Sequence, residues 1–321
     1  MRKFLVIRFS SIGDIVLTSP VLRNLRIAYP EARIDFVTKR NFQFAIENNP
    51  HIDQVHYLDN DIGALIFDLK QRDYDTIIDL HNNIRSKQIS KAFRGRNIRV
   101  LDKKNIKKWL LVNFKIDKLG NQHIVDRYLK TIESEVPNPD KEGLEYFLSI
   151  NDTVNLREYS LAKDNFIAVV VGGSFSTKQY PAQKHIEWIQ KYQGKIVLLG
   201  GKEDQNISKP IKEACSHVID LCGALSFNES AYIISQARKV ITNDTGLMHV
   251  AAAFDKEIIS IWGNTTPSIG MTPFGIALEK NHIIEEKVSC RPCSKLGHNK
   301  CPKKHFDCME KISNQKILQH L

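Results

Sequence analysis

The sequence predicts an α/β protein made of two doubly wound domains with a cleft between them. Strand patterns alternate with helical patterns along almost all of the 321 residues. This alternation runs through two series, which a polar segment with two prolines separates at residues 135–160. We therefore expect one domain over residues 1–155 and a second over 156–305. A helix over 306–321 is expected to return to the first domain.

Composition is that of an ordinary globular protein, with 42% hydrophobic and 26% charged residues. The apolar run at the amino terminus is too short for a signal peptide. No window offers the roughly 18 consecutive apolar residues that a membrane-spanning helix requires. We therefore expect a cytoplasmic protein.

The net charge of +10 comes from one segment. Residues 85–118 contain twelve Lys and Arg but only two Asp, and the remainder of the chain has 34 basic and 34 acidic residues. Such a segment is either a solvated lysine-rich face or an anion-binding surface. Trp109 and Leu110 among the lysines favour an apolar and anionic partner, such as the inner membrane surface or a phosphorylated glycolipid. Nucleic acid is disfavoured because no nucleic-acid-binding module is recognisable.

In the first domain, Phe4–Phe9 predicts a buried strand, Ser10–Asp14 a turn and Ile15–Tyr29 a helix. The Asp14 carboxylate at the carboxyl end of the strand suits a general base. It equally suits an acid that stabilises a helix amino terminus. The glycine spacing in this turn is not that of a dinucleotide-binding motif.

Two glycine turns follow strands in the second domain. Gly172–Ser174, with Ser176 and Lys178 nearby, offers N–H groups and a positive charge to a diphosphate, although it lacks the Walker A spacing. Gly200–Gly201 is followed by Glu203–Asp204, whose carboxylates suit ribose hydroxyls. An ordinary glycine loop explains either turn as well.

A third turn joins a strand over Lys239–Thr242 to a helix that begins at Gly246 or Leu247. The helix amino terminus, with Asp244 and His249 beside it, suits a phosphate or a sugar hydroxyl. Asp244-Thr-Gly also matches the signature of aspartic proteases. Those enzymes need two such carboxylates in a β-rich fold, and this chain has one copy among alternating strands and helices. A histidine such as His249 is otherwise most often a packed core residue.

Four cysteines near the carboxyl end have the spacing C-x2-C-x7-C-x6-C. One Cys-x-x-Cys pair is typical of zinc sites, but the second half is looser than a paired zinc knuckle. Structural zinc, reduced thiols and disulfides all remain open, and disulfides are least favoured in a cytosolic compartment. No His or carboxylate spacing indicates a catalytic metal. The four residues are Cys290, Cys293, Cys301 and Cys308.

Four motifs together resemble the ADP-heptose:lipopolysaccharide heptosyltransferases of glycosyltransferase family nine. They are Ile7–Pro20, Gly172–Pro181, Leu198–Gly201 and Asn243–His249, in this order. The resemblance implies the GT-B fold, in which two Rossmann-like domains face a cleft. It also implies inverting transfer, without a metal cofactor, of heptose or a related sugar from a nucleotide sugar to lipopolysaccharide core or another surface glycan. Tyr180 departs from the family, where tryptophan is common, and so does the cysteine-rich tail.

By this resemblance Asp14 is the catalytic base, Lys178 binds the donor diphosphate and Asp244 binds donor-sugar hydroxyls. The alternative is a catalytically weak scaffold that binds nucleotide sugars during envelope assembly. The remaining donor-side residues are Ser174, Ser176, Gly201, Glu203, Asp204, Leu225, Thr245, Gly246, Leu247 and His249. The acceptor-side residues are Ser10, Ser11, Gly13, Asp79, His81 and Arg85, next to the basic segment over residues 85–118.

Overall fold

A computed structural model describes residues 1–321, which form two compact units. The first unit contains residues 1–103 and 122–147, and the second contains residues 104–121 and 148–321. The chain therefore leaves the first unit near residue 147, within the polar segment that separates the two series of strands. The insertion of residues 104–121 into the second unit differs from the expected continuous first domain.

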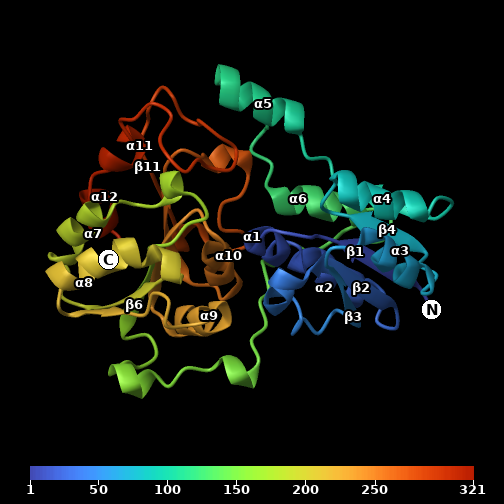
Figure 1. Cartoon of the computed structure of the whole chain (residues 1–321), viewed down its shortest axis with the longest axis horizontal. Coiled ribbons are helices and arrows are strands. Elements are labelled where there is room, and N and C mark those ends of the chain that lie inside the picture. The colour runs from blue at the N-terminus through green and yellow to red at the C-terminus, as the bar shows by residue number, and fades with distance from the viewer. The chain divides into compact units, whose positions relative to one another are not determined.

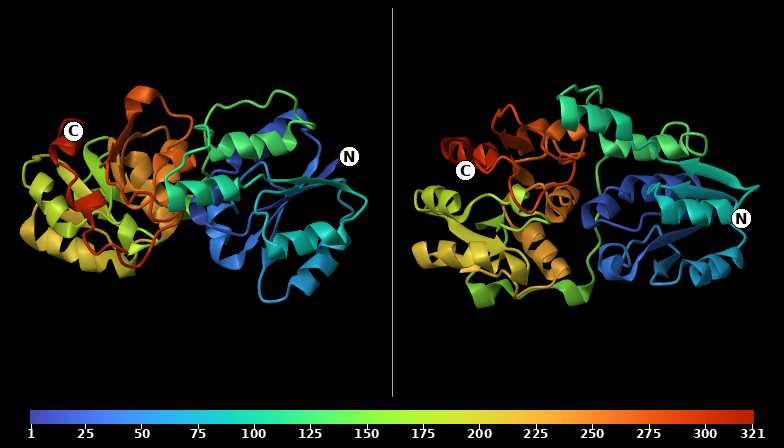
Figure 2. Two further views of the ribbon diagram at one scale, coloured as in Figure 1. Left: turned by 90° about the horizontal axis from the view of Figure 1, so that it is seen from above. Right: turned by 45° about the horizontal axis from the view of Figure 1, so that its top comes forward.

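The first unit is built on a parallel five-stranded sheet in the order β3-β2-β1-β4-β5. Strand β4 is fully buried, and β1 is buried except at Lys3, in agreement with the apolar run after that lysine. Helices lie on both faces of the sheet (Figures 1 and 2). The strands are β1 (Lys3–Ile7), β2 (Arg33–Lys39), β3 (Gln54–Leu58), β4 (Thr76–Asp79) and β5 (Asn97–Val100). The helices are α1 (Ile12–Val16), α2 (Ser19–Ala28), α3 (Ile62–Lys70), α4 (Ile84–Ala92) and α6 (Ile124–Leu129).

The single helix expected over Ile15–Tyr29 is two helices, α1 and α2. Pro20 is the reason for the break. It cannot donate an N–H group, and its ring would clash with the Val16 carbonyl in a continuous helix. In the first turn of α2 the same proline is tolerated.

The second unit contains a parallel six-stranded sheet in the order β11-β10-β9-β6-β7-β8. Helices α7 and α8 contact each other, as do α9 and α10, because each pair covers one face of this sheet. The strands are β6 (Phe166–Val170), β7 (Lys195–Leu199), β8 (Val218–Asp220), β9 (Lys239–Asn243), β10 (Glu257–Trp262) and β11 (Asn281–Glu285). The helices are α5 (Asn105–Phe114), α7 (Ala182–Ile189), α8 (Gln205–Ala214), α9 (Phe227–Gln236), α10 (Gly246–Ala253), α11 (Asp307–Glu310) and α12 (Gln315–Leu318).

The carboxyl-terminal segment over residues 306–321 belongs to the second unit. It forms two short helices, α11 and α12, and buries Met309, Ile312 and Ile317 in the core of the second unit. The Tyr180 hydroxyl donates a hydrogen bond to the side-chain oxygen of Asn314 at 2.8 Å. The tail therefore belongs to the second unit because its apolar side chains complete that unit's core.

The basic segment over residues 85–118 is divided between the two units. Helix α5, which carries its second half, is held by Leu111 and Leu119 against Ile269 of the second unit. The Lys115 ammonium group also donates to the Pro292 carbonyl at 2.8 Å. Residues 85–103 of the basic segment therefore belong to the first unit and residues 104–118 to the second. None of the helices combines the length and apolar character required to cross a bilayer.

Candidate functional site

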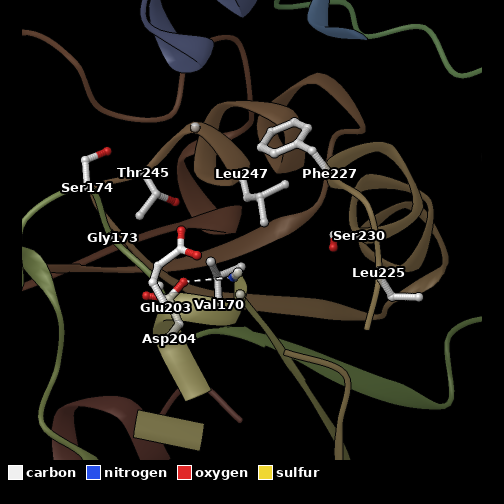
Figure 3. A pocket seen from close by; sticks show the side chains of 14 residues that line it. Val170, Gly173, Ser174, Glu203, Asp204, Leu225, Phe227, Ser230, Thr245 and Leu247 are labelled. Atoms are coloured by element: carbon white, nitrogen blue, oxygen red, sulfur yellow. Dashed lines mark hydrogen bonds between the residues drawn. The ribbon is translucent and has the colours of Figure 1, made fainter. Parts of the chain in front are cut away.

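A pocket of about 260 Å³ lies at the carboxyl edge of the second sheet. It opens where the strand order reverses, between β6 and β9, the position at which open α/β sheets bind ligands. The first turn of α9 and the amino terminus of α10 complete its wall (Figure 3). The lining residues are Val170, Gly172, Gly173, Ser174, Gly200, Gly201, Glu203, Asp204, Leu225, Phe227, Ser230, Thr245, Gly246 and Leu247.

Asp204 holds the two glycine turns of this pocket together. Its carboxylate accepts a hydrogen bond from the Gly201 N–H at 2.9 Å and another from the Gln179 side-chain amide at 2.8 Å. A Cβ atom on Gly172 would lie 2.3 Å from the Asp204 Oδ2 atom, so only glycine fits there. Burial raises the pKa of the Asp204 carboxyl above its ordinary value. The Asp204 carboxylate already accepts hydrogen bonds from protein groups, so Glu203 is the better candidate to bind ribose hydroxyls. The Glu203 carboxylate points toward Thr245 in Figure 3.

One side of the pocket is apolar because α9 begins there. The Ser226 side chain accepts the Glu229 N–H, and the Glu229 side chain accepts the Ser226 N–H, so a capping box fixes the first turn. This turn places Phe227 and Ser230 beside Leu225, across the pocket from Ser174 and Glu203 (Figure 3). Phe227 and Ser230 were missed from the sequence, although the Ser-x-x-Glu pattern marks the start of this helix.

The turn before α10 also forms part of the pocket. Thr245, Gly246 and Leu247 line it, and α10 begins at Gly246, so the unpaired amides of the helix amino terminus lie at the pocket wall. His249 lies further along α10 and is buried, with only 2% of its surface exposed. It therefore contributes to the support of the turn rather than to the pocket wall.

Lys178 and Asp244 form an ion pair beside this turn. The Lys178 ammonium lies 2.7 Å from an Asp244 carboxylate oxygen, which also accepts the Thr265 hydroxyl at 3.0 Å. Both side chains keep partial exposure, 15% and 13%. Neither lines the pocket, nor does Ser176, so these residues lie next to it rather than within it.

Asn243, the last residue of β9, connects the strand ends around the pocket. Its amide nitrogen lies 3.1 Å from the Val171 carbonyl oxygen and 3.0 Å from that of Gly172, and its amide oxygen accepts the Tyr180 N–H at 3.2 Å. These bonds couple the turn before α10 to the turn after β6. The motif containing Asn243 was recognised from the sequence, but this role follows only from the three-dimensional contacts.

In the first unit, Asp14 lies in α1 at the edge where the strand order reverses between β1 and β4. Arg8 forms an ion pair with one Asp14 carboxylate oxygen at 2.7 Å, and the Ser11 hydroxyl donates to the other at 2.9 Å. The Asp14 side chain keeps 20% of its surface exposed, whereas Arg8 is buried and donates to the Leu80 carbonyl at 2.7 Å. The carboxylate is therefore fixed in orientation and still open to solvent.

Asp79 and His81 follow β4 at the same edge of the sheet. One Asp79 oxygen accepts the His81 N–H at 2.9 Å and the Asn82 N–H at 2.6 Å, so it shapes the turn before α4. Burial, together with the nearby Arg8 guanidinium, lowers the pKa of His81 to about 3, so this imidazole is neutral at physiological pH. Arg85 is exposed in the first turn of α4.

Arg127 of α6 was not anticipated from the sequence. It is 4% exposed, and its Nε and Nη2 atoms have no hydrogen-bond partner in the protein. Tyr128, the next residue, lies under the Arg8 guanidinium with its ring centre 5.9 Å away. No local pattern marks these residues, because α6 lies more than a hundred positions after Asp14 in the sequence.

The four carboxyl-terminal cysteines lie in irregular chain after β11, except Cys308 in α11, and all are free thiols. The Cys290 sulfur is 3.8 Å from the His305 Nε2 atom, and the Cys293 thiol donates to the Cys290 carbonyl at 3.2 Å. Burial and the adjacent Cys290 thiol raise the pKa of Cys293 to about 11. No group of three or more His, Cys, Asp or Glu side chains is arranged to hold a metal ion.

Known proteins resemble this chain in both sequence and fold. Lipooligosaccharide heptosyltransferase 2 of Haemophilus influenzae is 24% identical over 293 residues, covering 82% of this chain and 84% of that protein. The glycosyl transferase family 9 structure from Veillonella parvula matches with a TM-score of 0.81 at 21% identity, covering 99% of this chain and 96% of that one. The E. coli ADP-heptose lps heptosyltransferase II structure matches with a TM-score of 0.70 at 20% identity, covering 99% and 97%.

These structural matches show that the chain has the GT-B fold predicted from its motifs. This fold also argues against the protease alternative, because Asp244 lies in a parallel α/β unit and aspartic proteases have a β-rich fold. The family model described as glycosyltransferase family 9 (heptosyltransferase) matches residues 62–304, more than half of the chain. The chain therefore belongs to glycosyltransferase family 9 and is a glycosyltransferase.

Proposed function

We propose that this glycosyltransferase moves heptose from ADP-heptose to an acceptor in the lipopolysaccharide core, with inversion at the anomeric carbon. The pocket at the amino terminus of α10 carries this proposal, because it combines a helix end suited to phosphates with an apolar wall suited to a nucleobase. The similar proteins from Haemophilus influenzae and E. coli, both named as heptosyltransferases, support heptose as the sugar.

In the proposed donor complex, the adenine lies against Leu225 and Phe227, and Glu203 binds the ribose hydroxyls. The diphosphate lies at the amides of Thr245 to Leu247, near Ser174. Lys178 approaches the same phosphates, and Asp244 binds hydroxyls of the sugar. The proposed donor thus extends from the apolar wall of the pocket to the Lys178–Asp244 ion pair beside it.

Transfer is proposed to proceed by a single displacement. The acceptor hydroxyl oxygen forms a bond with the anomeric carbon as the bond from that carbon to the diphosphate oxygen breaks. Asp14 takes the hydroxyl proton, and ADP leaves with the bonding electrons. The helix amino terminus and Lys178 stabilise the charge that develops on the leaving diphosphate, so this step needs no metal ion.

The first unit is proposed to bind the acceptor, an anionic glycolipid, at the inner face of the membrane. Ser10 and Ser11 form the turn before α1, and Gly13 precedes Asp14 within that helix. Arg85 is exposed in the first turn of α4, the helix that follows β4. The unpartnered nitrogens of buried Arg127 suit an acidic group of the acceptor. Asp79 and His81 shape this surface through the turn that they form.

Thermal unfolding with a panel of nucleotides tests the donor assignment. We expect ADP and ADP-heptose to raise the melting temperature and the corresponding UDP compounds to have little effect, because a ligand that binds only the native state stabilises it. ADP release that depends on a lipopolysaccharide acceptor then tests transfer. Stabilisation without acceptor-dependent ADP release would instead indicate a nucleotide-sugar-binding scaffold, and stabilisation by UDP compounds alone would reject the proposed donor.

We also propose that a structural zinc ion draws together Cys290, Cys293, Cys301 and Cys308, whose side chains are not arranged around a metal site in this structure. Their spacing supports it, as does the approach of His305 to the Cys290 sulfur in a segment with little regular structure. Elemental analysis of the purified protein is expected to find about one zinc per chain. Replacement of Cys290 and Cys293 by serine should remove the metal and lower the melting temperature, whereas Cys215→Ser is the control outside the cluster. Protein without zinc that keeps the same melting temperature would reject this site.

A further inference from the structure

Helix α5 and the residues after it expose an unusual number of large apolar side chains. Ile106 is 76% exposed, Trp109 55%, Phe114 59% and Ile116 46%. Ile106 and Trp109 are three positions apart and therefore lie on the same side of the helix. The Trp109 and Phe114 rings contact each other edge-on, with centroids 5.2 Å apart. These side chains therefore form one continuous apolar ridge rather than scattered contacts.

Lysines surround this ridge. Residues 104–118 contain five lysines and a single acidic residue, Asp117. Lys107 and Lys118 are exposed. Long lysine side chains extend their ammonium groups past an apolar surface that is buried in an interface. The combination of aromatic and aliphatic side chains with surrounding positive charge is typical of helices that lie in the headgroup region of anionic membranes.

Leu111 and the residues after α5 fasten this helix within the second unit. Leu111 and Leu119 are buried against Ile269 and Met271, and Lys115 donates to the Pro292 carbonyl at 2.8 Å. This helix is therefore a packed element of the unit that contains the nucleotide-sized pocket, while its ridge remains exposed. Leu111 is the α5 side chain that packs in this apolar cluster. The exposed side chains of the ridge are therefore not part of the core of the second unit.

We propose that α5 docks the second unit on an anionic bilayer, with Ile106, Trp109, Phe114 and Ile116 entering the headgroup region and the lysines contacting lipid phosphates. Charge complementarity favours a bilayer over a second copy of this chain, because two copies would bring the same lysines together. The inference goes beyond the proposed sugar transfer, since it does not depend on the identity of the donor or on Asp14. It places membrane contact on the unit with the candidate donor pocket.

Tryptophan fluorescence provides a direct test, because Trp109 is the exposed one of three tryptophans. Trp188 and Trp262 are 0% and 1% exposed. We expect phosphatidylglycerol-containing vesicles to shift the emission of the full-length protein to shorter wavelength and brominated lipids to quench it. Phosphatidylcholine vesicles alone should have a much smaller effect, and high salt should weaken binding. Neither change should occur in Trp109→Phe, in which the two buried tryptophans remain.

Vesicle cosedimentation tests the side chains that carry the interaction. Trp109→Glu combined with Phe114→Glu should lower vesicle binding by at least about tenfold, and Lys107→Glu combined with Lys118→Glu by roughly tenfold. Phe67→Glu, at an exposed phenylalanine of α3, and Lys91→Glu are the matched controls and should bind normally. Thermal unfolding followed by circular dichroism checks that each variant is folded.

Three results would overturn the proposal. The first is the absence of binding to anionic vesicles, and the second is binding that leaves Trp109 emission unchanged. The third is a concentration-dependent dimer that Trp109→Glu dissociates, which would assign the ridge to a second copy of the chain. Because none of these measurements requires sugar transfer, failure of the docking proposal is distinguishable from failure of the proposed function.

Discussion

Asp14→Asn is expected to lower kcat of sugar transfer by about a thousandfold, within the range for loss of a positioned general base. The substitution keeps the size of the side chain but removes its ability to take the acceptor proton. Binding of ADP, measured by calorimetry, should be unchanged within error, because Asp14 and the nucleotide-sized pocket belong to different units. Steady-state kinetics with acceptor and donor both saturating measure the effect on kcat.

Because Asp14 forms an ion pair with Arg8, this prediction needs a control for the stability of the variant. Asparagine leaves the buried Arg8 guanidinium without its carboxylate, which can destabilise the first unit. Unfolding must therefore be measured for each variant at the assay temperature. Asp59→Asn removes a carboxylate from an exposed ion pair with Arg40 in the same unit and should keep normal turnover. A folded Asp14→Asn enzyme with undiminished kcat would show that another group is the base.

Lys178→Ala is expected to lower kcat/KM by about a hundredfold or more, because the variant lacks the positive charge that meets the leaving diphosphate. The loss should depend on the diphosphate itself. We expect affinity for ADP to fall clearly while the weak binding of adenosine is unchanged, since the apolar wall at Leu225 and Phe227 is intact. Calorimetry with ADP, AMP and adenosine, combined with turnover, separates these contributions.

Lys184→Ala is the matched control for Lys178. Lys184 lies in α7 of the same unit, is similarly buried and has only a long contact of 3.7 Å with Glu187. Its loss should leave ADP affinity and turnover close to those of the unmodified enzyme. If Lys178→Ala and Lys184→Ala have equal and small effects, Lys178 belongs to a structural ion pair with Asp244 and not to the diphosphate site.

Much of the fold was predictable because the relevant signals are local. Strands β1, β6 and β7 contain continuous apolar runs, and the turns after β1, β6, β7 and β9 are marked in the sequence by glycine and polar residues. The GT-B fold and the family follow from the same turns. Of the residues predicted for the donor site, Ser174, Glu203, Leu225 and the residues from Thr245 to Leu247 line one pocket, and their role in donor binding stays a prediction.

Other features could not be predicted from the sequence, because they depend on contacts between residues that are far apart along the chain. Asp204 looks like a ligand-binding carboxylate, yet its contacts with Gly201 and Gln179 make it a support for the turns. Arg127 comes within electrostatic reach of Asp14 only after α6 has packed against α2. The tail over residues 306–321 was expected in the first domain, and its buried side chains place it in the second unit.

The sequence by itself thus determined the alternation of strands and helices and the chemistry of the strand-end turns, because backbone freedom and apolar periodicity are properties of neighbouring residues. Which carboxylates accept hydrogen bonds from protein groups, and which unit contains α5, could be seen only in the three-dimensional contacts. Those outcomes depend on burial against residues such as Ile269, which lies about 150 positions beyond α5 and leaves no local mark on the helix sequence.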